Sequence, residues 1–193
     1  MLKYYYFRIK NITNIIDQNN LRKAGIDMKK KKEPKKIFKN FWHVGVVVKD
    51  LGRTLDTLTN VFGIGPFKIV DFPPKDTDED IEMTYYGEPA NFSAKFCFAK
   101  MGDIELEIIQ PISGKSVWFD FLEKHGEGIH HLKYEVPDLE ETKQYLNEYD
   151  FKMIQSGSAV GANKGKTWAY FGTEDKAGFV IEVLNELPPE KKK

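Results

Sequence analysis

Two stretches of the chain share the same succession of hydrophobic and polar positions. Each opens with His, continues through a strand-like run rich in apolar residues, and closes with Asp-Leu; the two are His43 to Leu51 and His131 to Leu139. Self-similarity at two points of one chain indicates that a single structural unit is used twice. We therefore expect an internal duplication rather than one irregular domain.

A helical pattern follows each of these stretches. Mostly apolar residues recur at spacings of three and four, which places them on one helix face; they are Leu51, Leu55, Leu58 and Phe62 in the first unit and Leu139, Thr142, Leu146 and Tyr149 in the second. Asp50 and Asp138 precede these helices. Both are predicted N-caps, because a carboxylate can accept the free amide hydrogens of a first turn.

Three further strands are predicted in each unit. They cover 67–71, 94–100 and 104–110 in the first unit, and 151–156, 167–171 and 179–184 in the second. Each unit is therefore βαβββ, which makes the fold class α+β, and a short helix over 115–125 links the units. Neither unit is large enough for a core of its own, so the two should pack together.

The acidic, Pro-containing segment 72–91 is predicted to be a surface loop, with a mobile loop over a site as the alternative.

Charge divides the chain into regions. Residues 1–40 hold 12 Lys/Arg and 3 Asp/Glu, whereas residues 41–193 hold 17 and 26. Six lysines gather between Lys29 and Lys36, and such a run resists packing. We expect a partly disordered basic extension over 1–40, a folded domain over 41–187 (units 41–112 and 128–187) and a tail over 188–193. The alternatives are that the extension contacts an anionic surface or nucleic acid, or that the true start of the protein is Met28.

Composition excludes several classes of protein. With 41% hydrophobic and 30% charged residues the chain is typical of a globular protein, and its formal net charge of +0 argues against nucleic-acid binding. No apolar stretch is long enough for a membrane span. The single cysteine, Cys97, excludes an intrachain disulfide or a cysteine-clustered zinc site and favours a reducing, cytoplasmic compartment.

The duplication also repeats two residue types that bind metals. Each unit begins with a histidine, His43 or His131, and ends on a strand that carries a carboxylate among apolar neighbours. In the first unit that carboxylate is Glu105 or Glu107, which share a strand face; in the second it is Glu182. A carboxylate in an apolar run is costly unless it is paired or ligates a metal. Two His and two Glu together suit one divalent ion such as Co, Ni, Mn, Zn or Fe.

These features resemble the vicinal oxygen chelate superfamily. The strongest stretches are His43 to Leu51, 107–111, Gly128 to Leu139 and 178–182. The resemblance implies two pseudo-symmetric βαβββ modules whose sheets form a cup around one metal site. It also implies the ligands His43, Glu107, His131 and Glu182, with His131 preferred over His130 because it is in register with His43.

Within the superfamily, residues 128–132 and 177–182 are most similar to methylmalonyl-CoA epimerases. The resemblance implies a metal-dependent isomerase that moves a proton next to a carbonyl through a metal-stabilised enolate, with Glu182 as a catalytic base. A second carboxylate of that branch matches Asn91 here, and Glu88, three residues away, is the nearest acidic candidate for the second catalytic residue. The substrate would be a small molecule, an acyl-CoA or a thiol adduct.

Two other functions remain open. The same four ligands are similar to those of bacterial glyoxalase I, a lactoylglutathione lyase. Some relatives bind small molecules without catalysing a reaction. A ring-cleaving dioxygenase fits less well, because it needs a site of two His and one carboxylate with open positions. Exposed sheet edges make a homodimer an expectation. His130, the loop lysines Lys164 and Lys166, and Cys97 are expected to have structural or solvated roles.

Overall fold

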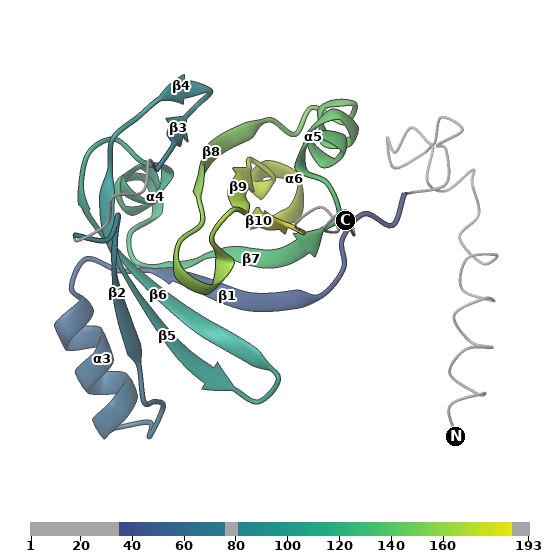
Figure 1. Ribbon diagram of the computed structural model, residues 1–193. Helices are drawn as coiled ribbons and strands as arrows, with labels where there is room; N and C mark the ends of the chain where they lie inside the picture. The colour runs from purple at the N-terminus through teal and green to yellow at the C-terminus, as the bar shows by residue number, and fades with distance from the viewer. Residues whose placement is uncertain (1–34, 76–80, 187–193) are drawn as a thin grey trace, which may run out of the picture. The chain divides into compact units, whose positions relative to one another are not determined.

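The structure is a computed structural model that describes residues 35–75 and 81–186. These residues form a ten-stranded mixed sheet in the order β2-β5-β6-β1-β7-β10-β9-β8-β3-β4. The sheet curls into a half-barrel, as Figure 1 shows. The cup-like α+β fold expected from the sequence is confirmed. No helix among the described residues is long and apolar enough to cross a membrane.

The elements follow one another in two similar series. The first half of the chain holds β1 (Phe41–Val47), α3 (Leu51–Asn60), β2 (Lys68–Phe72), β3 (Met83–Tyr85), β4 (Glu88–Pro89), β5 (Ser93–Met101) and β6 (Ile104–Ser113). The linking helix α4 (Val117–His125) comes next. The second half holds β7 (Gly128–Val136), α5 (Leu139–Asn147), β8 (Met153–Ser158), a 3-10 turn η1 (Gly161–Asn163), β9 (Thr167–Phe171), α6 (Glu174–Ala177) and β10 (Val180–Asn185).

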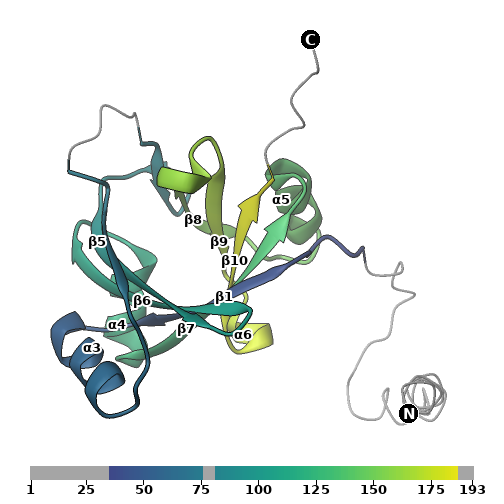
Figure 2. The same cartoon turned by 60° about the horizontal axis from the view of Figure 1, so that its bottom comes forward.

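The two halves are related by a pseudo-twofold arrangement in the middle of the sheet. β1 and β7 are antiparallel neighbours there, as Figures 1 and 2 show. Each is flanked by the last strand of its own half in parallel, β6 beside β1 and β10 beside β7. The strands that open and close each repeat are therefore the four central strands of the sheet.

Three clusters of buried side chains hold the layers together. Helix α3 packs Leu51, Leu55 and Leu58 against the outer side of the first half, near Cys97 and Ile108. Helix α5 covers the second half through Leu146, beside Val136 and Phe171. The largest cluster includes Phe72, Phe92, Trp118, Trp168 and Tyr170, from both halves and from α4. Of these residues, Phe72, Trp118, Trp168 and Tyr170 also line the inside of the cup.

Both predicted helix caps are present. The Asp50 carboxylate accepts a hydrogen bond from the Arg53 amide at 2.9 Å, and the Asp138 carboxylate accepts one from the Glu141 amide at 2.7 Å. Each helix thus starts where its strand ends, because the Asp satisfies an amide that the first turn leaves free. This fixes the direction in which each chain segment leaves the central strands.

The segment predicted as a surface loop contains a small hairpin instead. Strands β3 and β4 pair with each other, and β3 also pairs with β8 of the second half. The Thr84 and Ser156 hydroxyls lie 2.7 Å apart across that pairing. The Tyr85 hydroxyl donates to both Asp120 carboxylate oxygens at 2.9 Å, which ties the hairpin to α4. The first half of the chain therefore supplies the far edge of the second half's sheet.

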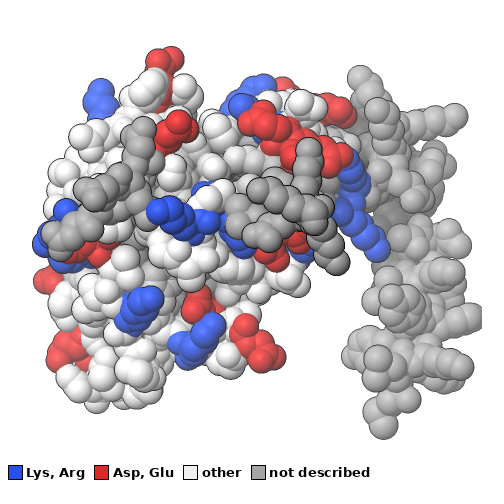
Figure 3. Space-filling model, in the orientation of Figure 1, with Lys and Arg blue, Asp and Glu red and all other residues white. Residues whose placement is uncertain are grey.

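Most of the predicted basic extension and all of the predicted tail lie outside the described residues, so the partial disorder expected of the extension stays a prediction. The described surface carries both signs of charge. On the face drawn in Figure 3, aspartate and glutamate gather in the region of α5, and lysine and arginine are scattered over the rest of that face.

Candidate metal centre

The four predicted ligands come together at the centre of the cup. His43 lies on β1, Glu107 on β6, His131 on β7 and Glu182 on β10. One ligand atom of each lies within 4.8 Å of those of the other three, and all four side chains are buried. The central strands place them there: Gly45 on β1 pairs with both Glu107 and His131. His43 lies two residues earlier on the same strand, so three of the four ligands come from these neighbouring strands.

The distances suit a single ion. His43 Nε2 lies 3.2 Å from His131 Nε2, 3.2 Å from Glu107 Oε2 and 3.1 Å from Glu182 Oε2. His131 Nε2 lies 3.2 Å from Glu107 Oε2 and 2.9 Å from Glu182 Oε2. Ligand atoms at about 2.1 Å from one ion, at right or tetrahedral angles, are about 3.0 to 3.4 Å apart. Two imidazoles and two carboxylates are also a donor set that divalent transition metals accept.

An unsatisfied atom points to the same centre. Glu107 Oε2 is buried without a hydrogen-bond partner among the described residues, although both imidazole Nε2 atoms lie 3.2 Å away. A buried carboxylate oxygen without a partner is costly, and metal coordination removes that cost. The residues present therefore fit a divalent metal ion.

The charges in the cluster depend on one another. Burial opposes the charged form of His43, but the neighbouring Glu107 and Glu182 carboxylates outweigh it and raise the His43 pKa to about 9. Burial likewise opposes charge on Glu107, yet His43 and His131 lower the Glu107 pKa to about 2. The metal-free cluster thus holds ionised carboxylates against a protonated histidine, and a metal ion would replace that proton.

One glycine makes room for the second histidine. A β-carbon built on Gly45 would overlap the imidazole ring of His131. Gly45 is the cross-strand partner of His131 in the β1–β7 pair. Any side chain at position 45 would therefore push His131 out of the cluster.

His130 contacts the far side of a ligand. Its Nδ1 lies 3.0 Å from His131 Nδ1, while His131 Nε2 faces the cluster. Burial, together with the nearby His131, holds the His130 pKa well below its usual value, so this ring stays neutral. If His131 Nε2 binds a metal, His131 carries its proton on Nδ1, and a neutral His130 then accepts a hydrogen bond from that Nδ1–H.

Lys133 is a residue of the site that sequence reasoning missed. It lies on β7 two positions after His131, and its buried Nζ makes an ion pair of 2.9 Å with Glu182 Oε1. Alternation along a strand places residues two apart on one face. The spacing from His131 was the signal that would have revealed it.

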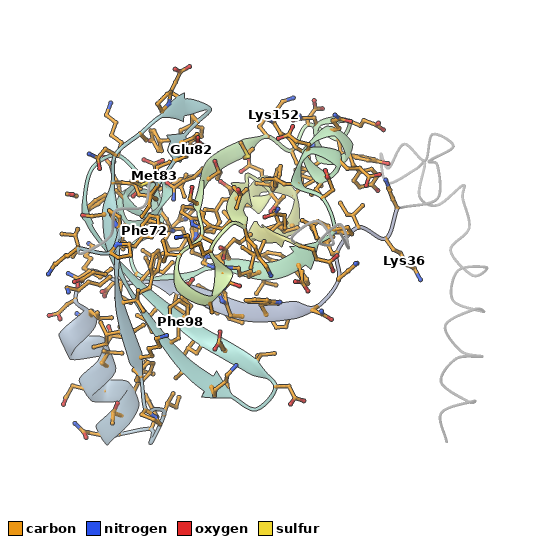
Figure 4. The ribbon with its side chains drawn as sticks, viewed as in Figure 1. Lys36, Phe72, Glu82, Met83, Phe98 and Lys152 are labelled. Carbon is orange, nitrogen blue, oxygen red and sulfur yellow. The ribbon has the colours of Figure 1, made fainter. Side chains whose placement is uncertain are left out.

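The cluster opens into a cavity of about 810 Å³. Its walls are largely aromatic and come from both halves of the chain: Trp42, Phe72, Phe96, Phe98, Trp118, Trp168 and Tyr170. Figure 4 labels Phe72 on β2 and Phe98 on β5. The Tyr170 ring packs against that of His131, with 4.9 Å between centroids. A volume of this size accommodates a small organic ligand, and apolar walls exclude water from its reacting part.

Other residues singled out from the sequence lie elsewhere. Glu88 and Asn91 are exposed and line a second hollow with Tyr86 and Lys115, outside the cavity of the four ligands. Glu105 lines the main cavity but forms an ion pair with Lys100 at 3.1 Å. The structure thus brings Glu182 and the three other predicted ligands together and does not bring Glu88 to them.

Two further residues considered from the sequence, Cys97 and Lys166, contact other parts of the fold. Cys97 is buried beneath α3, and burial raises the pKa of its thiol to about 11. The Lys166 Nζ lies 3.7 Å from Glu135 Oε1 and also lies over the Trp42 ring, 5.7 Å from the ring centroid. Neither takes part in the ligand cluster.

Comparison with known proteins identifies the family. A family model described as the Glyoxalase/Bleomycin resistance protein/Dioxygenase superfamily matches residues 42–170. The chain belongs to this superfamily. Among curated proteins, an uncharacterized Bacillus subtilis protein, YqjC, is 26% identical over 73% of this chain and 88% of its own. An ethylmalonyl-CoA/methylmalonyl-CoA epimerase of Cereibacter sphaeroides is 25% identical over 73% of this chain and 93% of its own.

Solved structures of other proteins show the same fold. A hypothetical protein of Bacillus halodurans superposes with a TM-score of 0.54 at 22% identity, over 77% of this chain and 95% of its own. A variant of Streptomyces coelicolor methylmalonyl-CoA epimerase, in complex with 2-nitronate-propionyl-CoA, superposes with a TM-score of 0.53 at 17% identity, over 78% and 99%.

Proposed function

We propose that the protein is a metal-dependent isomerase that moves a proton at the carbon next to a carbonyl, as an epimerase of acyl-CoA thioesters does. The observation that carries the proposal is the buried convergence of His43, Glu107, His131 and Glu182 at the base of a cavity. The similarity to methylmalonyl-CoA epimerases supports the same reaction class.

The four ligands have distinct tasks in this proposal. His43, Glu107 and His131 hold a divalent ion, and Glu182 both holds it and faces the cavity. A divalent ion at this point supplies Lewis acidity to the carbonyl beside the reacting carbon. His130 fixes the orientation of His131 through the contact between their Nδ1 atoms.

Proton transfer is assigned to Glu182. Its carboxylate is ionised, because Lys133 and His131 outweigh the effect of burial and hold its pKa well below the usual value. An ionised carboxylate beside the carbonyl-binding position accepts the proton from the adjacent carbon, and inversion then requires that a proton is delivered to the opposite face of that carbon. The aromatic walls keep bulk water from the reacting carbon during that exchange.

Deuterium exchange tests the proposal directly. The metal-loaded protein in D2O should incorporate deuterium at C2 of methylmalonyl-CoA faster than a protein-free sample, as mass spectrometry would show. The Glu182→Gln variant should lose this exchange. Glu105→Gln is the matched control, since Glu105 lines the same cavity but lies outside the ligand cluster. Undiminished exchange in Glu182→Gln with bound metal would remove Glu182 from the mechanism.

A glyoxalase-type lyase is the second candidate. The position of Glu88 favours it: this carboxylate lies in another hollow, and Glu182 is thus left without the second carboxylate expected of the epimerase branch. A single base suffices when a proton is moved between neighbouring carbons of a hemithioacetal. Formation of lactoylglutathione from methylglyoxal and glutathione, without exchange at C2 of methylmalonyl-CoA, would select this reaction over the epimerase.

A further inference from the structure

The pseudo-twofold relation of the two halves is broken at one pair of positions. Gly45 lies two residues after His43 and pairs with Glu107 on β6. Lys133 lies two residues after His131 and pairs with Glu182 on β10. The same position of the two repeats thus carries no side chain in one half and a long cationic side chain in the other.

The Lys133 ammonium is buried where it faces the cavity. Lys133 is 9% exposed and lines the cavity. Its Nζ lies 2.9 Å from Glu182 Oε1 and 5.8 Å from the centre of the Trp42 ring. An ammonium carries three N–H donors. The ion pair with Glu182 is the one ion pair of Lys133 found among residues 35–75 and 81–186, and it occupies one donor.

The charges of the site do not balance without a further anion. The two carboxylates of the ligand set, Glu107 and Glu182, neutralise a divalent ion, so the positive charge of Lys133 is in excess. The other acidic groups that line the cavity do not compensate it: Glu105 is paired with Lys100, and Asp103 is exposed at the rim. An unbalanced buried charge is costly, and a bound anion removes that cost.

We propose that Lys133 binds an anionic oxygen of the substrate and thereby selects carbonyl compounds that carry a carboxylate beside the reacting carbon. This inference rests on the proposed function, because it assumes a divalent ion held by the four ligands. Lys133 and the ion then attract the substrate from two sides, with Glu182 between them. Neutral carbonyl compounds gain only one of these two interactions.

Binding of malonate to the cobalt-substituted protein tests the role of Lys133 without any turnover. Malonate is a small dicarboxylate and malonamide is its neutral counterpart; the visible absorption of the cobalt ion and calorimetry report binding of each. Removal of a hydrogen bond to a charged group corresponds to a loss of about tenfold or more. We expect Lys133→Met to weaken malonate binding by at least about tenfold, Lys133→Arg to restore most of it, and malonamide binding to stay unchanged.

A second lysine serves as the matched control. Lys68 lines the same cavity but is exposed, so Lys68→Met should leave malonate binding unchanged. Equal malonate affinity in wild type and Lys133→Met, or no malonate binding in wild type, would overturn the inference while the metal site stands. Loss of metal from Lys133→Met and Lys133→Arg alike would also overturn it, since Lys133 would then only hold Glu182. Absence of metal from the wild type would instead overturn the proposed function.

Discussion

The imidazole of His131 occupies the space that a side chain of Gly45 would need. The two residues face each other across the antiparallel β1–β7 pair, at the pseudo-twofold centre of the sheet. This contact decides whether the second histidine can reach the ligand cluster. Gly45 has no side chain that could bind a metal, but through this contact it affects the proposed metal centre.

Substitution of Gly45 should therefore remove the metal. In Gly45→Ala the new β-carbon overlaps His131, and because interiors are closely packed the ring must leave its position. We expect metal content well below one ion per chain, measured by elemental analysis, with the far-ultraviolet circular dichroism of a folded protein. Gly52→Ala, on α3 with only an ordinary contact at 3.5 Å, should keep the wild-type metal content. Full metal content in Gly45→Ala would contradict this account.

The metal should be lost with either histidine ligand. Wild-type protein is expected to contain about one divalent ion per chain, and His131→Ala much less, because each ligand contributes directly to the affinity. Elemental analysis after incubation with Co, Ni, Mn and Zn measures this. His125→Ala alters an exposed histidine at the end of α4 and should have no effect. No metal in the wild type under any of these conditions would make the chain a cup-shaped binding protein instead.

Metal uptake should release a proton near neutral pH. Without metal, His43 has a pKa of about 9, raised from 6.5, and is protonated at pH 7. Metal binds only the neutral ring, so affinity should rise about tenfold per pH unit up to about pH 9 through this group. Calorimetry in buffers with different ionisation enthalpies measures the proton count. Zero protons released at pH 7 would show that His43 is already neutral there.

The same raised pKa affects the stability of the metal-free protein. A histidine whose pKa is higher in the folded state stabilises that state below its unfolded value of 6.5, and this contribution is lost as pH rises through about 9. Chelator-treated protein should thus lose thermal stability between pH 6.5 and 9.5 by more than the metal-loaded protein does. Parallel melting curves for both forms, followed by circular dichroism, provide the comparison. Identical pH profiles would contradict the prediction.

Removal of the His130 hydrogen bond should weaken the metal site without abolishing it. His130→Phe keeps a ring between Phe121 and Tyr170 but removes the nitrogen 3.0 Å from His131 Nδ1. Loss of such an outer hydrogen bond typically lowers metal affinity about 10- to 100-fold. Competition with a chromogenic chelator measures this change. Unchanged affinity would indicate that packing alone orients His131.

The repeat, and the meeting of two His with two Glu, could be predicted from the sequence, while their role as metal ligands stays a prediction. Each His opens a strand and each Glu lies on a closing strand, so the period of two along a strand and the duplication together specify their meeting point. Glu107 and Glu105 share a face, and only the pairing of Glu107 with Gly45 puts it at the centre. That register depends on contacts between distant segments, which periodicity does not report.

The hairpin and the site's asymmetry were not predicted for physical reasons. β3 and β4 are only three and two residues long, too short for a periodic pattern, and the pairing of β3 with β8 joins segments far apart in the chain. Glu88 was chosen by proximity in sequence, but this hairpin carries it away from the cluster. Lys133 shares a strand face with His131, but that spacing alone does not distinguish a buried lysine from the solvated lysines usual in strands.

The difference between Gly45 and Lys133 has a stereochemical consequence. A planar group bound on the axis of a perfect twofold site would meet the same surroundings above and below, and neither face would be preferred. Here the His131 ring fills the space beside Gly45 in one half, whereas the other half presents an ammonium paired with Glu182. The two faces of a trigonal carbon in the cup therefore have chemically different surroundings. The duplicated fold can thus distinguish one face of such a carbon from the other.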